Sequence, residues 1–286
     1  MGRDLYDGNA AARELFDRAD AVLGRPISKL CFEGPADELS KTFNAQPAIY
    51  LTSLACLAAA RANGALDGDP AFMSGHSLGE YTALAAAGAI DFDAGLRLVE
   101  QRGKLTQAAA DATPGGMAAV LGLDEVAAQA VCDETGAELC NLNSPGQIVI
   151  GGSKDQIAKA CALSLERGAK RAIPLDVGGA FHTSLMQPAV APMAEALAAV
   201  EVRSPRIPVI ANNSGRPMAD PVAIRDELAF QLTHPVRWVQ CVEYMAGEGV
   251  TTFVEIGPGR VLSGLIKRIA KDVATKNING MGSLTA

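Results

Sequence analysis

Clusters of basic residues are missing from this 286-residue chain, which has no run of five or more lysines or arginines. Its formal net charge is −7 and its isoelectric point is about 5.1. Nucleic-acid binding depends on concentrated positive charge that neutralises phosphate groups. We therefore expect no nucleic acid among its partners.

Cysteine motifs and long apolar segments are also missing. The six cysteines show no Cys-x-x-Cys spacing and lie mostly in apolar stretches, so we expect buried free thiols rather than disulfides or zinc ligands. Charges or glycines interrupt every alanine-rich segment, and the N-terminus is polar. These features predict a cytoplasmic protein with no metal site, neither exported nor bound to a membrane.

The order of apolar segments predicts an α/β fold. With 49% hydrophobic and 20% charged residues, the chain has the composition of a globular protein. Strand-like and helical patterns alternate, which favours a parallel sheet covered by helices on both faces. Strands are expected at 71–73, 207–211 and 252–256, and helices at 10–23, 46–63, 78–89, 91–110, 187–200, 222–231, 239–247 and 261–270.

A smaller unit is inserted between Pro114-Gly115-Gly116 and Gly178-Gly179. Its patterns follow the order β-α-β-β-α-β, with a turn at Asn143-Ser144-Pro145-Gly146, and this order is that of a ferredoxin-like unit. We expect this small subdomain at 113–176. The core, formed by 1–112 and 177–286, is expected to be a parallel-sheet α/β-hydrolase-like unit.

Gly75-His76-Ser77-Leu78-Gly79 matches the Gly-x-Ser-x-Gly nucleophile elbow, a tight turn between a strand and a helix. The turn is expected to need small residues on both sides of Ser77 for want of room. The helix that follows directs N–H groups at the serine, and the backbone N–H of Leu78 is the candidate oxyanion donor. A structural glycine turn also explains the pentapeptide, but the flanking strand and helix favour a nucleophile.

Histidine is scarce, which narrows the search for a base that activates Ser77. The three histidines are His76, His182 and His234. His182 lies in a glycine-bearing loop between a strand and a helix, where parallel sheets present functional groups. His76 should point away from its neighbour Ser77, as elbow packing or a substrate neighbour, and His234 precedes a proline in an ordinary loop. His182 is therefore the candidate base.

Six segments, which include the elbow and the His182 loop, occur in a recognisable order and spacing. They are Gly75 to Tyr81, Arg102-Gly103, Asn143 to Gln147, Ala180-Phe181-His182, Gln187-Pro188-Ala189 and Glu255 to Gly259. Together they resemble the signature segments of the malonyl-CoA:acyl carrier protein transacylases, over essentially the whole chain. The resemblance implies transfer of a malonyl group from malonyl-CoA to acyl carrier protein through a seryl ester, in fatty acid or polyketide synthesis. It also implies a monomer with no permanently bound cofactor.

The resemblance assigns roles to individual residues. Ser77 corresponds to the nucleophile, His182 to the base, and Gln231 to the residue whose backbone carbonyl orients that base. Arg102 corresponds to the arginine that binds the malonyl carboxylate, for which a planar guanidinium is better suited than a lysine. Phe181 resembles the aromatic residue of malonyl-selective members.

Other assignments keep a second reading. Asn143 matches a segment that lines the family's cleft, and it also fits an ordinary hairpin turn. Because acyl carrier protein is acidic, a local basic patch should receive it despite the negative net charge. The candidates for this patch, which are equally explained as solvated surface charges, are Lys170, Arg171, Arg260, Lys267 and Arg268.

The chain departs from the family pattern in one respect. Family members usually open with a strand and a Gly-Gln-Gly-Ser-Gln loop that supplies a second oxyanion donor, and this sequence contains no such segment. A start assigned at an internal methionine, a shortened chain and a divergent protein all explain this. Loss of one donor costs about 10²- to 10³-fold in rate, so we expect this form to be weakly active or unstable.

Two other functions use the same residues. A serine esterase or thioesterase would pass the acyl group to water, but a hydrolase of neutral esters has no need of Arg102. A homologue that binds carrier protein without catalysis would form no acyl ester at Ser77.

Overall fold

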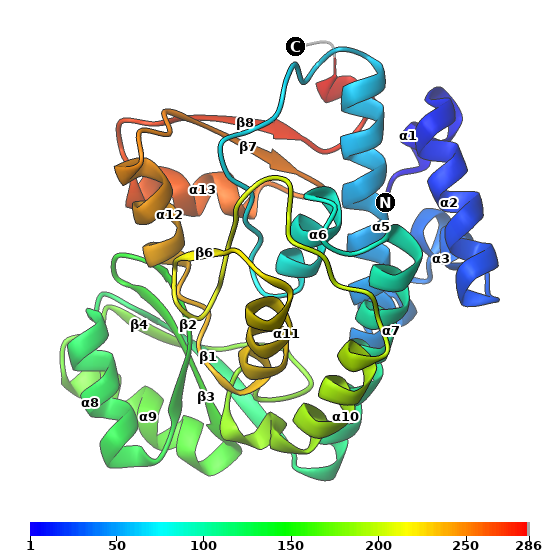
Figure 1. The fold of residues 1–286 in the computed structure, drawn as a ribbon. Coiled ribbons are helices and arrows are strands. Elements are labelled where there is room, and N and C mark those ends of the chain that lie inside the picture. Colours follow the sequence, from blue (N-terminus) through cyan, green and yellow to red (C-terminus); the bar gives the residue numbers. More distant parts are fainter. Residues whose placement is uncertain (285–286) are drawn as a thin grey trace.

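Helices from the N-terminal part of the chain, together with two helices that follow the inserted unit, form the largest hydrophobic core of the computed structural model, which describes residues 1–284 (Figure 1). α5 packs against α7 and α2, and α10 packs against α7 and α11. This layer carries the segments on which Ser77 and Arg102 lie. Its helices are α1 (Arg3–Gly8), α2 (Ala10–Leu23), α3 (Ile27–Glu33), α4 (Ala36–Ser40), α5 (Thr42–Ala62), α6 (Leu78–Ala86), α7 (Phe92–Ala112), α10 (Gln187–Ala198) and α11 (Pro221–Phe230).

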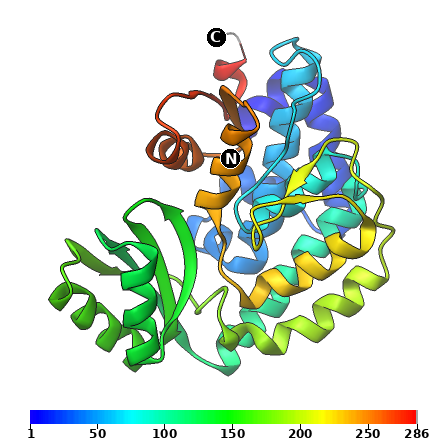
Figure 2. The same cartoon turned by 60° about the vertical axis from the view of Figure 1, so that its left-hand side comes forward.

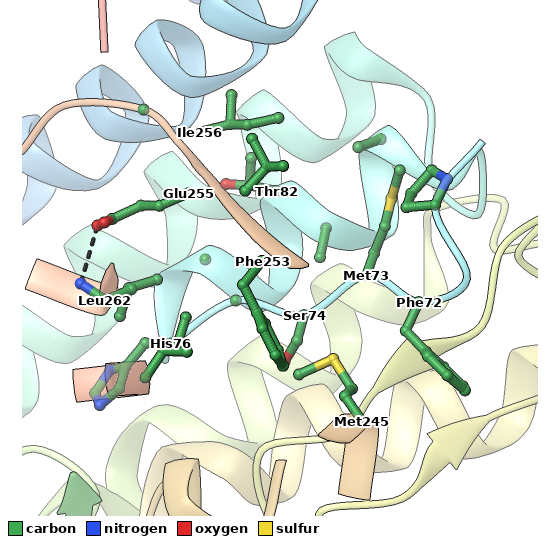
Figure 3. A pocket seen from close by; sticks show the side chains of 18 of the residues that line it. Phe72, Met73, Ser74, His76, Thr82, Met245, Phe253, Glu255, Ile256 and Leu262 are labelled. Carbon is green, nitrogen blue, oxygen red and sulfur yellow. Dashed lines mark hydrogen bonds between the residues drawn. The ribbon is translucent and has the colours of Figure 1, made fainter. Parts of the chain in front are cut away.

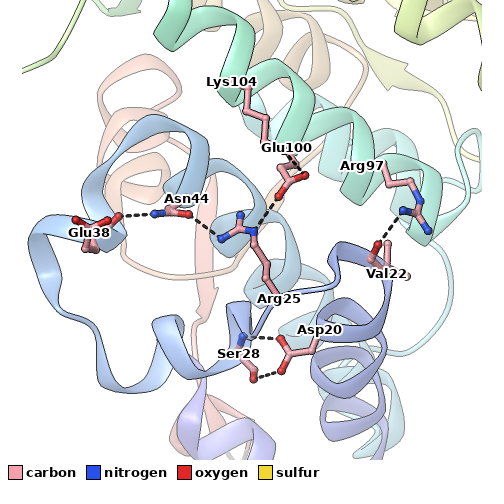
Figure 4. Close-up of polar contacts among 9 residues, drawn as sticks. All are labelled: Asp20, Val22, Arg25, Ser28, Glu38, Asn44, Arg97, Glu100 and Lys104. Carbon is pink, nitrogen blue, oxygen red and sulfur yellow. Dashed lines mark hydrogen bonds and ion pairs between the residues drawn. The ribbon is translucent and has the colours of Figure 1, made fainter.

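Local chemistry explains where these helices begin and end. The side chain of Asn9 accepts a hydrogen bond from the Ala12 N–H at the start of α2, and Gly24 ends that helix with a φ of 63°. Asp91 caps α7 in the same way, through the N–H of Asp93. Polar contacts then tie α2 and the loop that follows it to α7 (Figure 4). Arg25 donates to Glu100, two residues before Arg102, at 2.9 Å.

The C-terminal part adds two helices and two strands around a separate hydrophobic core. α12 (Trp238–Gly247), α13 (Val261–Ile269) and β7 (Thr252–Ile256) pack together, and β8 (Ala274–Ile278) pairs with β7 in parallel. A second parallel pairing is limited to a bridge between Met73 and Val209. β5 (Val209–Ile210) also pairs with β6 (Pro217–Met218), in antiparallel orientation.

A cavity of about 940 Å³ separates these two parallel pairings (Figure 3). Its walls include Phe72 and Met73 on one side and Phe253 and Ile256 of β7 on the other. Within the part of the chain that the structure describes, β7 has one strand partner, β8, and no strand joins it to the Met73 segment. The expected continuous parallel sheet is therefore two short pairings.

The small unit lies beside the core, and the two views show it as a distinct body (Figures 1 and 2). Its antiparallel sheet has the order β2-β3-β1-β4, and two helices cover one face. The elements are β1 (Gly115–Leu121), α8 (Glu125–Thr135), β2 (Glu138–Ser144), β3 (Gln147–Ser153), α9 (Lys154–Glu166) and β4 (Arg171–Pro174). The β-α-β-β-α-β order expected from the sequence is confirmed.

Backbone hydrogen bonds join the small unit to the core at one point. The N–H of Leu142 in β2 donates to the carbonyl of Val236, and the Val236 N–H donates to the carbonyl of Cys140. The uncovered face of the small sheet contributes Met117 and Val149 to an apolar cluster that includes Phe181 of the core. The edge of the small unit is thereby brought next to the nucleophile elbow.

Most expected elements are present. The strand at 252–256 has the bounds predicted, and α2 matches 10–23. The strand expected at 71–73 is reduced to the Met73 bridge, because only one neighbour is available for hydrogen bonding. No element was expected at 27–40 or 274–278, where α3, α4 and β8 form; these segments are short and have little apolar periodicity. All six cysteines are free and five are buried, as expected.

Candidate functional site

Ser77 lies on a sharp turn between the Met73 bridge and α6. Its φ of 53° is in the left-handed region, which residues other than glycine rarely adopt. Asn212 holds this turn from both sides. Its Oδ1 accepts the Ser77 N–H at 2.6 Å, and its Nδ2 donates to the Gly75 carbonyl at 2.7 Å.

The two glycines of the elbow are not equivalent. A Cβ added at Gly75 would lie 2.0 Å from the carbonyl oxygen of Gly79, whereas a Cβ at Gly79 would meet nothing within 4 Å. The expectation that small residues are required on both sides of Ser77 is therefore wrong for Gly79. The reason is that Gly79 lies in the first turn of α6 on the side that faces the cavity.

His182 is brought to the nucleophile by the loop after β4. Its Nε2 lies 2.8 Å from the Ser77 Oγ, and its Nδ1 lies 2.8 Å from the backbone carbonyl of Gln231. A carbonyl oxygen only accepts, so Nδ1 carries the proton and Nε2 is free to accept the serine proton. Burial and the positive charge of Arg102 lower the pKa of His182 to about 3, which keeps the imidazole neutral.

The contact between His182 and the Gln231 carbonyl has the form expected from the sequence. The side chain of Gln231 also forms hydrogen bonds within the site. Its Oε1 accepts from Arg102 at 2.9 Å, and its Nε2 donates to the Ser77 carbonyl at 3.1 Å and to Glu80. Gln231 therefore connects the histidine, the nucleophile segment and the arginine.

Arg102 projects from α7 into this site and is only 5% exposed. Its Nη1 donates to Gln46 at 2.7 Å, and its Nη2 donates to Gln231 at 2.9 Å and to the Ser77 Oγ at 3.1 Å. Nε is buried and has no hydrogen-bond partner among residues 1–284. Burial lowers the pKa of Arg102, and none of the ion pairs within residues 1–284 includes it. Burying a charge without an ionic partner costs free energy, which makes the Arg102 guanidinium a candidate group for binding an anionic ligand.

The backbone N–H of Leu78 starts α6 beside the Ser77 side chain. The next two backbone N–H groups already form hydrogen bonds: Gly79 donates to the His76 carbonyl and Glu80 donates to the Ser77 carbonyl. Among the described residues, no acceptor takes the Leu78 N–H. This donor, at the positive end of a nine-residue helix, is available to an oxyanion.

His76 turns away from the nucleophile, as expected. Its Nε2 lies 2.8 Å from the Asn143 Oδ1, and its ring lies 5.7 Å from that of Trp238. Burial lowers the pKa of His76. Asn143, at the end of β2, is thus brought by the small unit to the elbow. His234 is elsewhere: it stacks on Phe230 and bonds to the Phe230 carbonyl.

The large cavity is distinct from the Ser77, His182 and Arg102 cluster. Gly75, His76 and Leu78 contribute to its wall, but none of the three clustered residues is among the described residues that line it (Figure 3). Residues 1–284 contain no cluster of three or more histidine, cysteine, aspartate or glutamate side chains arranged to hold a metal. None of the helices in that range has the length and apolarity needed to cross a bilayer.

Sequence reasoning missed three polar residues that hold the site. Gln46 binds Arg102 and Asn212 holds the elbow, and neither lies in a motif that indicates this contact. Glu80 lies inside the elbow segment three residues after Ser77, but its partners, Asn212 and Gln231, are more than 130 residues away in sequence. Only the fold brings them together.

Comparisons with known proteins agree with this geometry. The family described as Acyl transferase domain matches residues 1–283. The malonyl CoA-acyl carrier protein transacylase of Bacillus subtilis (strain 168) is 45% identical over 280 residues, which are 96% of this chain and 87% of that protein. The crystal structure of acyl-carrier-protein S-malonyltransferase from Burkholderia pseudomallei 1710b is 45% identical with a TM-score of 0.93, covering 98% of this chain and 92% of that one.

A third comparison concerns a complex. A structure described as a type II PKS acyl-carrier protein in complex with its malonyl-transacylase is 40% identical to this chain, with a TM-score of 0.93. It covers 99% of this chain and 92% of that one. Because the family match extends over almost every residue, including the elbow and the histidine loop, the chain belongs to the acyl transferase family.

Proposed function

We propose that this protein transfers a malonyl group from coenzyme A to acyl carrier protein through an ester at Ser77. The observation that carries the proposal is the Arg102 guanidinium, which is buried, lacks an ionic partner among the described residues, and lies 3.1 Å from the Ser77 Oγ. An acyl group that bears its own carboxylate supplies the missing negative charge. The names of the Bacillus and Burkholderia relatives support this substrate.

In the first step the Ser77 Oγ attacks the thioester carbonyl and the His182 Nε2 accepts the hydroxyl proton. The Gln231 carbonyl, 2.8 Å from Nδ1, stabilises the imidazolium that forms. The carbonyl oxygen becomes an oxyanion near the Leu78 N–H. When the intermediate collapses, the carbon–sulfur bond breaks and His182 returns the proton to the coenzyme A thiolate.

The second step repeats the first with a different nucleophile. The thiol of the carrier protein's phosphopantetheine arm gives its proton to His182 and attacks the malonyl ester. Collapse breaks the ester bond to Ser77 Oγ, which recovers the proton from His182. No electron is transferred in either half, so the chemistry needs no redox cofactor.

Arg102 selects the acyl group. The guanidinium has five N–H donors, and Gln46, Gln231 and the Ser77 hydroxyl accept three of them. Once Ser77 is esterified, its oxygen becomes a weaker acceptor, so the Nη2 N–H that it accepted is released to the malonyl carboxylate. Phe181, part of the apolar cluster with Met117 and Val149, lies next to His182 and limits space for a branched acyl chain.

Leu78 donates to the oxyanion, a role that its unpaired N–H among the described residues, at the start of α6, supports. The described chain has no counterpart of the Gly-Gln-Gly-Ser-Gln loop.

The fold follows the same assignment, with a hydrolase-like core and a ferredoxin-like subdomain at 113–176. The strand order β2-β3-β1-β4 of the small sheet supports the ferredoxin-like assignment. In this arrangement Asn143 and His76 line the approach to Ser77 from the small subdomain side.

The carrier protein docks where α13 meets the small subdomain. Arg268 of α13 donates to Gln147 of β3 at 2.5 Å, and both Lys267 and Arg268 are exposed. Gln147 shares the cavity wall with Asn143 and His76, so this basic pair lies beside the entrance to the elbow. Attraction between this pair and an acidic carrier protein orients the encounter.

Intact mass measurement tests the first half-reaction. After incubation with malonyl-CoA, we expect a malonyl adduct on Ser77, and its disappearance when holo acyl carrier protein is added. Ser77→Ala should form no adduct. Ser74→Ala is the matched control, because Ser74 is on the same segment and its hydroxyl bonds to the Ile210 carbonyl instead of His182.

Other outcomes would point to other functions. An adduct that is lost to water at the same rate with and without carrier protein indicates a hydrolase. Absence of any adduct in the unmodified chain, together with carrier-protein binding, indicates the non-catalytic homologue.

A further inference from the structure

Glu80 is a buried carboxylate for which the transfer steps have no use. It lies one turn after Ser77 on α6 and its side chain is 0% exposed. A buried carboxylate is costly unless its oxygens are hydrogen-bonded. The groups that form hydrogen bonds to the Glu80 oxygens therefore indicate the role of this side chain.

The two oxygens of Glu80 have different partners. Oε1 accepts the backbone N–H of Asn212 at 2.8 Å, and Oε2 accepts from the Nε2 of Gln231. The other end of the Gln231 amide, Oε1, accepts from Arg102 at 2.9 Å. A side-chain amide has one accepting end and one donating end, so a carboxylate on one side forces the oxygen to the other.

We infer that Glu80 is a positioning residue that sets the selectivity for malonyl by holding the Gln231 amide with its oxygen toward Arg102. The inference rests on the malonyl transfer proposed above. Through this relay Glu80 fixes the plane and position of the guanidinium without touching it. Arg102 is thereby held ready for the substrate carboxylate without a direct ion pair that would compete for it.

The role of Glu80 rests on the hydrogen bonds of its two oxygens. Burial and the neighbouring Glu227 raise the pKa of Glu80 well above its usual range, and the Asn212 N–H, the Gln231 amide and the positive Arg102 offset only part of that rise. Both oxygens accept N–H groups, and this geometry orients the Gln231 amide.

Glu80→Gln tests the relay with almost no change in shape. The new carbonyl oxygen still accepts the Asn212 N–H, because a backbone donor cannot turn. The new NH₂ group then faces the NH₂ of Gln231, and the Gln231 amide must rotate and turn its own NH₂ toward Arg102. The Asn212 contacts to the elbow are retained, whereas the Gln231 amide loses its hydrogen bond to the Ser77 carbonyl and the arginine loses an acceptor.

The readout is the ratio of kcat/KM for malonyl-CoA to that for acetyl-CoA, which has no carboxylate for Arg102 to bind. We expect Glu80→Gln to lower this ratio about 10- to 100-fold, mainly through a higher KM for malonyl-CoA, as for the loss of a charge-assisted contact. The acetyl reaction should change less than about threefold.

Glu227→Gln is the matched control. Glu227 is also buried and its Oε1 accepts the Asn213 N–H at 2.8 Å, but it has no hydrogen bond to Gln231 or Arg102. This substitution removes a carboxylate from the same region and should leave the malonyl to acetyl ratio unchanged.

A double-mutant cycle identifies the route. Gln231→Met keeps the backbone carbonyl that orients His182 and removes the side-chain amide, so it should reproduce the loss of selectivity. If Glu80 acts through that amide, Glu80→Gln adds little further loss to Gln231→Met.

Three results would overturn the inference: equal losses for malonyl and acetyl, the same loss in Glu227→Gln, or losses that multiply in the double variant. Failure of the proposed function itself is recognised separately, because the unmodified chain would then form no malonyl adduct at Ser77.

Discussion

Ser77 and His182 are the two residues other than glycine with positive φ, 53° and 62°, in the part of the chain that the structure describes. Such backbone strain persists only where the surroundings hold it, and it concentrates at functional sites. Here the Asn212 side chain holds the serine and the Gln231 carbonyl holds the histidine. Each strained residue is therefore held by polar contacts from a distant segment.

His182 should remain an effective base well below the usual pH range of histidine. Its pKa is lowered to about 3, because burial and Arg102 disfavour the charged ring. A lowered pKa means that the neutral, accepting form persists as the pH falls through 6.5. We expect the rate of Ser77 acylation, followed by rapid quench and mass measurement from about pH 4 to about pH 8, to stay nearly constant down to about pH 4.

An acidic limb near 6.5 in that experiment would show that His182 is not desolvated in solution. Circular dichroism at each pH is the control, since unfolding also reduces the rate.

At the scale of elements, the elbow depends on the close approach of a loop to a helix. Gly75 passes so near the first turn of α6 that an added Cβ would lie 2.0 Å from the Gly79 carbonyl oxygen. The arginine depends on another element, α7, which is tied to the N-terminal helices by the Arg25 to Glu100 ion pair (Figure 4). Nucleophile and arginine are thus placed by two helices that pack on each other.

Gly75→Ala should be much more damaging than Gly79→Ala. The first substitution forces two backbone segments apart, and we expect the free energy of unfolding to fall by about 3 kcal/mol and acylation to be lost. The second places a methyl group in open space within a helix, so stability should change by less than about 1 kcal/mol. Chemical denaturation and the Ser77 adduct assay measure both effects. Equal damage from the two substitutions would contradict the geometry of the elbow.

At the scale of the whole molecule, the site is assembled where the small unit meets the core. Asn143 from β2 contacts His76 of the elbow, and the Val236 backbone joins β2 to the core segment that follows Gln231. We propose that a carrier protein delivers its arm to Ser77 along this junction, beside the exposed Lys267 and Arg268 of α13.

Reversal of that charge should impair the carrier step alone. For Lys267→Glu combined with Arg268→Glu, we expect transfer from malonylated Ser77 to holo acyl carrier protein to slow about tenfold or more at low ionic strength, and less in high salt. Acylation by malonyl-pantetheine, which lacks the nucleotide phosphates, should be unchanged. Stopped-flow transfer assays measure the carrier step.

The control for this prediction is Lys154→Glu combined with Lys159→Glu. It makes the same change in net charge on α9, which covers the outer face of the small sheet. A similar slowing in the control would indicate a general effect of net charge rather than docking at α13.

The sequence by itself determined the features that depend on residues close together along the chain. The elbow around Ser77, the isolated histidine in a glycine loop and the β-α-β-β-α-β order of 113–176 depend on residues close together along the chain, because turn chemistry and apolar periodicity act over short ranges. The small number of histidines also narrowed the search for a base, since only one of the three lies in a suitable loop. The role of Arg102 came from resemblance, because a single arginine on a helix carries no local signal.

Only the tertiary structure decided how those groups are held and charged. The contacts of His182 with Ser77, of Arg102 with Gln231 and of Glu80 with Gln231 each join segments more than 100 residues apart. Burial in the packed fold is also what lowers the pKa of His182. Desolvation and hydrogen-bond geometry arise when such segments pack together, and neither leaves a trace in local sequence. For the same reason the elbow sequence predicts equal steric constraint at Gly75 and Gly79, whereas the folded backbone leaves room for a side chain at Gly79 alone.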